Sequence, residues 1–121
     1  MTKQDALYDF FSSFGLTAYE ATNVSEDATL PYLTYTYADD DFYGNQAAII
    51  VNLWYRTESN ATPNDKVSDI ADVVGRGGVM IPCDGGVIWM KKGSPFAQSI
   101  ADSDPDIRRR YINLTAEFLT A

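Results

Sequence analysis

The chain has 121 residues, which is the size of one domain. Hydrophobic residues at 45% and charged residues at 21% are ordinary globular values, and they exclude a disordered, collagen-like or coiled-coil chain. The formal charge of -8 disfavours sequence-independent binding to nucleic acid, because an acidic surface repels phosphate.

Several kinds of chemistry are also excluded by composition. There is no histidine, which removes the commonest general base and the commonest metal ligand. The single cysteine, Cys83, allows no internal disulfide and no thiolate metal cluster. The longest apolar run, residues 47–51, is far shorter than the roughly 20 residues of a membrane helix, and no export signal precedes it. We therefore expect residues 1–121 to form one soluble intracellular domain.

The first predicted element is an amphipathic helix near the N-terminus. Thr2 and Asp5 have the spacing of an N-terminal cap, and Gly15 is a helix-ending glycine. Between them, apolar residues recur at the helical spacing i, i+3, i+4 and i+7, at Leu7, Phe10, Phe11 and Phe14. This stripe predicts a helix that packs on a core.

The next segments predict strands. Residues 16–31 are rich in turn-forming residues, with at most one short strand at 18–20, and residues 32–37 alternate with period two. A turn at Asp39, Asp40, Asp41 and Gly44 follows. Residues 46–57 give the strongest strand signal, because every second residue from Ala47 to Tyr55 is apolar.

The second half predicts a helix, a hairpin and a last strand. The helix begins with Thr62 as its cap, carries an apolar stripe from Val67 to Val74 and ends at Gly75. A hairpin follows, with strands at 79–81 and 87–90 around a glycine-containing turn. Residues 91–105 are predicted to be irregular, and residues 111–120 form an alternating strand.

Together these elements predict an α+β two-layer sandwich. Two amphipathic helices need a sheet face on which to bury their apolar stripes, so we expect both to pack on one face. The hairpins predict a mostly antiparallel sheet of four to five strands.

Two loops have the composition of ligand sites but lack the required pattern. The glycine-rich residues 75–78 follow a helix, where the dipole is negative, so we interpret them as a helix stop and not as a phosphate loop. Residues 102–106 resemble the start of a calcium loop, but Ile107 and Asn113 stand where glycine and glutamate are needed. We therefore expect no metal ion and no cofactor.

Arg108, Arg109 and Arg110 form the one basic cluster. On a strand, Arg108 and Arg110 share a face and Arg109 points to the other. Three interpretations remain open: local pairing with the acidic residues of 102–106, contact with a subunit or partner, and contact with DNA.

The aromatic residues outside the predicted core also allow two interpretations. They either form the underside of a two-layer core or provide a self-association surface, since aromatics and arginine are enriched at interface centres. These residues are Tyr32, Tyr43, Trp54, Trp89 and Tyr111.

Eight blocks, in this order along nearly the whole chain, resemble a family of phage and prophage minor capsid, tail-completion or tail-terminator proteins. That family belongs to phages with long, non-contractile tails. The blocks are residues 7–15 (LYDFFSSFG), 18–20 (AYE), 31–35 (PYLTY), 51–56 (VNLWYR), 75–78 (GRGG), 82–86 (PCDGG), 92–98 (KGSPFAQ) and 109–118 (RRYINLTAEF).

The resemblance implies a homo-hexameric ring at the head-proximal end of the tail tube. Such a ring ends tube polymerisation and joins the tail to the head, so its partners would be the tail tube protein and the head connector. DNA would only pass through the lumen, which an acidic lining permits. The expected location is the neck of the virion, and the host cytoplasm during assembly, with no membrane contact.

The resemblance carries no catalytic residues, and we expect no enzymatic activity. As contacts for the ring or its partners we predict Trp54 and Arg56, on the second face of the long strand, and Arg108 and Arg110, which begin the last one. Two alternatives remain: a head–tail connector or stopper under the portal, and a carboxylate-dependent, metal-assisted hydrolase that uses Asp39–Asp41 or Asp102–Asp106.

Overall fold

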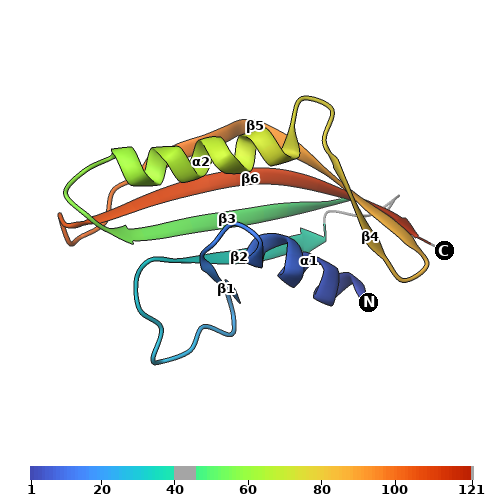
Figure 1. Ribbon diagram of the computed structural model, residues 1–121, viewed down its shortest axis with the longest axis horizontal. Helices are drawn as coiled ribbons and strands as arrows, with labels where there is room; N and C mark the ends of the chain where they lie inside the picture. The colour runs from blue at the N-terminus through green and yellow to red at the C-terminus, as the bar shows by residue number, and fades with distance from the viewer. Residues whose placement is uncertain (40–45, 121) are drawn as a thin grey trace.

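A computed structural model describes residues 1–39 and 46–120 of the chain. In these residues the chain forms two helices and six strands (Figure 1). In chain order they are α1 (Lys3–Ser12), β1 (Thr17–Glu20), β2 (Tyr32–Asp39), β3 (Gln46–Arg56), α2 (Ala61–Val74), β4 (Val79–Cys83), β5 (Gly86–Ile100) and β6 (Ile107–Thr120).

The strands form one sheet in the order β1-β2-β3-β6-β5-β4. All neighbouring pairs are antiparallel except β1 and β2, which run parallel. The prediction of an α+β fold is confirmed, but the predicted four to five antiparallel strands become a mixed sheet of six over the described residues. The reason is that β1 reaches β2 through residues 21–31, and such a crossover, unlike a hairpin, brings the next strand in parallel.

One face of the sheet carries the hydrophobic core. On β3, alternate residues from Ala47 to Tyr55 are buried, as predicted, and the same alternation continues on β6 at Ile112, Leu114 and Ala116. Both helices place their apolar residues in this cluster, with Phe11 from α1 and Ile70 from α2 fully buried. The two helices therefore share one face of the sheet, and the opposite face is left open (Figure 1).

The helix ends follow the predictions in part. The Thr2 hydroxyl accepts a hydrogen bond from the Asp5 backbone N–H at 3.1 Å, so the predicted cap of α1 is confirmed. Gly75 ends α2 with a φ of 72°. The predicted Thr62 cap is wrong: α2 begins at Ala61, and the preceding Asn60 makes no side-chain cap bond, because its amide oxygen accepts from Arg110.

The segment predicted to be irregular, residues 91–105, mostly continues β5 as far as Ile100. Pairing with β6 is interrupted between Lys92 and Ala97. This irregularity disturbs the alternation of apolar and polar residues, which is why the sequence predicted no strand here although the segment remains in the sheet. At Gly93 a side chain is excluded, because a Cβ atom would lie 2.8 Å from that of Asn113. β5 and β6 therefore remain paired on both sides of this local irregularity.

None of the helices in the described parts of the chain is long and apolar enough to cross a membrane. The predicted turn at Asp40, Asp41 and Gly44 lies outside the described residues, as does Tyr43.

Candidate assembly surface

The open face of the sheet carries a row of aromatic side chains that ends in an arginine. Ring centroids are 5.6 Å apart for Tyr19 and Tyr32, and 6.3 Å apart for Tyr32 and Trp54. The guanidinium carbon of Arg109 lies 4.5 Å from the centroid of the Trp54 ring. These four side chains, which we call the aromatic row, cross β1, β2, β3 and β6, and all are partly exposed.

Hydrogen bonds fix both members of the pair at the end of the aromatic row. The Arg109 Nε donates to the Asn52 Oδ1 at 2.9 Å, and the Trp54 Nε1 lies 3.5 Å from the Thr34 hydroxyl. A guanidinium held flat on an indole is attracted by the ring and keeps its other N–H groups free for a further acceptor. The aromatic row therefore presents a rigid surface of the residue types that interfaces favour.

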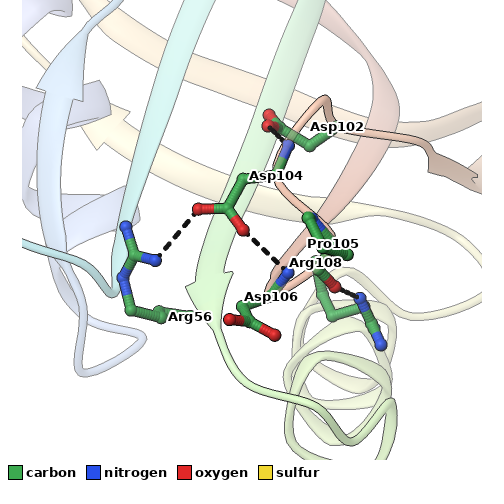
Figure 2. Close-up of polar contacts among 6 residues, drawn as sticks. All are labelled: Arg56, Asp102, Asp104, Pro105, Asp106 and Arg108. Carbon is green, nitrogen blue, oxygen red and sulfur yellow. Dashed lines mark hydrogen bonds and ion pairs between the residues drawn. The ribbon is translucent and has the colours of Figure 1, made fainter.

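Arg56, a predicted contact residue, lies at the end of β3 beside the loop between β5 and β6 (Figure 2). Its Nη1 lies 3.1 Å from the Asp104 Oδ2. The Asp104 Oδ1 accepts from the Asp106 backbone N–H at 2.9 Å, and the Asp102 carboxylate accepts from the Asp104 N–H at 3.0 Å. The Asp106 N–H, and secondly Arg56, lower the pKa of Asp104 below its ordinary value. This ion pair is exposed, so it orients the loop more than it stabilises the fold.

Arg108 is the second residue of β6 and joins two loops through hydrogen bonds. It donates to the backbone carbonyls of Pro105 and of Glu58, the second at 3.2 Å (Figure 2 shows the first). In the described residues none of the three consecutive arginines forms an ion pair with Asp102, Asp104 or Asp106. The interpretation of local charge pairing is therefore wrong for this cluster, because Asp104 pairs with Arg56 instead.

Arg110 lies on the core face and is only 6% exposed. It donates to the Asn64 Oδ1 at 3.0 and 3.1 Å and to the Asn60 Oδ1 at 3.0 Å, so it ties the start of α2 to β6. Burial, with a smaller effect of the neighbouring Arg108, lowers the pKa of Arg110 below its ordinary value. In the single chain this side chain contributes to the packing of α2, and its part in assembly stays a prediction.

The four predicted contact residues are thus only partly brought together. Arg56 and Arg108 lie at the same end of the sheet, Trp54 lies on its open face, and Arg110 is beneath α2. Sequence reasoning missed Arg109 as a member of the surface. The signal was present, because alternation along β6 places Arg109 opposite Arg110, and the register pairs Arg109 with Trp54.

Within the described residues, the carboxylate groups do not come together as a metal site. No group of three or more potential metal ligands exists within residues 1–39 and 46–120. Cys83 is free and half-buried at the end of β4. Of the two acidic clusters weighed for hydrolase chemistry, Asp102–Asp106 is engaged in its own loop, and Asp40 and Asp41 lie outside the described residues.

No family model and no curated protein matches the chain. Among solved structures, the fold is similar to a chain in the virion of a native gene transfer agent particle, with a TM-score of 0.56 and 19% sequence identity. The match covers 95% of this chain and 92% of the other. At this identity the likeness establishes a shared fold.

Proposed function

We propose that the protein is a structural component of a phage-like virion. The observation that carries this proposal is the fold likeness to a virion chain, which spans nearly the full length of both proteins. The resemblance of eight sequence blocks to phage tail-completion proteins supports the same class independently.

More specifically, we propose a tail terminator: a homo-hexameric ring at the head-proximal end of the tail tube that ends polymerisation and joins tail to head. A ring of identical subunits needs two different, complementary surfaces on each copy. The aromatic row, with Arg56 and Arg108 at one end of the sheet, would provide one contact surface. The net charge of -8 would let DNA pass through the lumen without adhering.

The role proposed here is non-catalytic. Assembly proteins act through shape and contact energy, for which rigid aromatic and arginine side chains are suited. The hydrolase alternative requires reactive carboxylates, and it is tested by replacing Asp102, Asp104 and Asp106 together with alanine. Normal particle yield from that variant would exclude a hydrolase that uses Asp102–Asp106, and the same replacement of Asp39, Asp40 and Asp41 tests the other cluster.

The test of the proposal is negative-stain microscopy of lysates from a phage that lacks this gene. A terminator predicts DNA-filled heads beside detached tails of uncontrolled length. Empty heads beside finished tails of normal length would instead assign the protein to the connector. Intact infectious particles would overturn the structural role.

Protein location provides a second test. Immunogold labelling of purified particles is expected at the neck, between head and tail. Absence of the protein from purified particles, measured by mass spectrometry, would contradict a virion component of either kind.

A further inference from the structure

A pocket of about 330 Å³ opens between α1 and the strands β1 and β2. Its lining combines two acidic residues, Asp5 and Glu20, with the aromatic residues Tyr8 and Tyr35. In the described parts of the chain neither carboxylate forms an ion pair. A pocket of negative charge and aromatic rings suits a cation, because carboxylates attract it and ring faces stabilise it.

Tyr35 provides an independent indication of a ligand. Its side chain is 4% exposed and its ring stacks on Phe11, with centroids 4.7 Å apart. Its hydroxyl lines the pocket but has no hydrogen-bond partner among residues 1–39 and 46–120. Burial, and secondly the charge of Glu20, raise the pKa of Tyr35 to about 12, so the phenol is neutral at physiological pH. Because Tyr35 lines the pocket, its neutral hydroxyl can accept a hydrogen bond from an incoming N–H donor.

Among the described residues, one cation has no partner and can be that donor. Of the nine lysine and arginine residues, eight have a hydrogen-bond, ion-pair or ring partner within the described residues, and Arg76 has none. The eight are Lys3, Arg56, Lys66, Lys91, Lys92, Arg108, Arg109 and Arg110. Arg76 is exposed.

The turn that carries Arg76 is held in a fixed shape. Gly75 and Gly78 have φ angles of 72° and 87°, which residues with a side chain rarely adopt. The Trp89 Nε1 donates to the Gly77 carbonyl at 2.9 Å, and the Lys91 amine lies 4.3 Å from the centroid of the Trp89 ring. The arginine is therefore presented by a preorganised turn, which lowers the entropic cost of a contact.

The pocket and the turn lie at different edges of the sheet. The pocket is built on β1, one edge strand, and the turn leads into β4, the other edge strand. In Figure 1 this turn stands beyond the end of α2, away from β1. A contact between the two sites of different copies is head-to-tail, and such contacts close into rings when the rotation permits.

We propose that Arg76 of one copy inserts into the Asp5–Glu20–Tyr35 pocket of the next copy. The guanidinium pairs with the two carboxylates, stacks on Tyr8 and donates to the Tyr35 hydroxyl. This inference rests on the proposed ring and names the contact that would build it. The occupant is chosen by charge complementarity, since Arg76, which has no partner among the described residues, meets a pocket whose two carboxylates form no ion pair there.

The proposed contact is tested by reversing the charge on each side of it, singly and together. The full-length wild type is compared with Arg76→Glu, Glu20→Arg and the double variant by sedimentation equilibrium over a range of concentrations. Each single change is expected to weaken self-association by about 10-fold or more, because like charges then face each other. The double variant is expected to recover most of the loss. Lys92→Glu and Glu26→Arg are matched controls, because both alter exposed charges outside the turn and the pocket.

A second variant addresses the hydroxyl. Tyr35→Phe keeps the ring that stacks on Phe11 and removes only the proposed acceptor, so it is expected to weaken association by several-fold without unfolding the chain. Circular dichroism of each variant establishes that the monomer is folded before association is compared.

Three results would overturn the contact. They are single variants that associate like the wild type, a double variant with no recovery, and a wild type that stays monomeric at its highest soluble concentration. The proposed function is decided separately by tail length in the gene deletion. An Arg76→Glu variant that assembles like the wild type therefore refutes this contact and leaves the terminator role standing.

Discussion

Arg109 and Arg110 are neighbours in sequence but lie on opposite faces of the same strand. Arg110 is buried beneath α2, and its guanidinium donates to Asn60 and Asn64. Arg109 is partly exposed and stacks on Trp54 on the open face. The core face therefore uses arginine to bind a helix to the sheet, whereas the open face leaves an arginine partly exposed.

The difference shows that strand alternation, and not residue type, divides structural from surface roles here. Leu53 pairs with Arg110 on the core face and Trp54 pairs with Arg109 on the open face. A shift of the register by one residue would exchange both pairs. The different roles of the two faces can therefore be tested by comparing a substitution on the core face with a similar substitution on the open face.

The largest expected difference is between Leu53 and Ile50 on β3. Leu53 is fully buried, so Leu53→Ala is expected to lower the free energy of unfolding by about 3 kcal/mol through the cavity it leaves. Ile50 lies on the open face, and Ile50→Ala is expected to cost less than about 1 kcal/mol in the isolated chain. Urea denaturation measures both. Equal losses would show that the open face is already packed in the monomer.

The two arginines provide the next comparison. Arg110→Ala removes the donor to Asn60 and Asn64 and is expected to cost about 2 kcal/mol of unfolding free energy. Arg109→Ala loses one hydrogen bond and the stacking on Trp54, at about 1 kcal/mol or less. Thermal denaturation of the two variants side by side ranks them, and a larger loss for Arg109→Ala would reverse the assignment of the faces.

Trp54→Ala is expected to separate folding from assembly. The ring is partly exposed, so the monomer should stay folded with a loss of about 1 kcal/mol, while self-association is abolished. Size-exclusion chromatography with light scattering reports assembly, and circular dichroism reports the fold. Thr115→Ala, on the same open face of β6, serves as the control. Unchanged particle formation by Trp54→Ala would contradict its role as a contact residue.

The smallest expected effect is the pH dependence at Asp104. Because the pKa of Asp104 is lowered in the folded chain, the stability it contributes is present above the ordinary aspartate pKa and is lost as pH falls below it. NMR titration of the side-chain carboxyl carbon measures the pKa of Asp104 in the folded chain. Arg56→Gln should raise the pKa only part of the way, because the Asp106 N–H is the larger cause. A complete return to the ordinary value would show that Arg56 acts alone.

Much of the fold was predictable because its strongest patterns are local. The stripe of α1, the alternation of β3 and the glycine at the end of α2 each appear in the sequence and in the structure. What escaped prediction depends on distant residues. The extension of β5 to Ile100 is imposed by pairing with β6, and the N-terminal cap of α2 is absent because Arg110 engages Asn60.

The candidate surface was less predictable for the same reason. Alternation indicated that Arg108 and Arg110 share a face, but not that this face would be covered by α2 at Arg110. The link between Trp54 and Arg109 needs the register between β3 and β6, strands separated by 50 residues of chain, which no local pattern contains. Arg76 was recognised only as part of a helix stop, since its lack of a partner is a property of the folded molecule.

The place of β6 in the sheet has a consequence for how the protein is made. It follows all other strands in the chain, yet it lies between β3 and β5. During synthesis from the N-terminus, β1–β3 and the β4–β5 pair are made before the strand that joins them in the sheet. A product that stops before Ile107 lacks the strand that pairs with both β3 and β5, and with it the buried side chains of Ile112, Leu114 and Ala116. The two parts of the sheet can therefore be joined only after β6 has been synthesised.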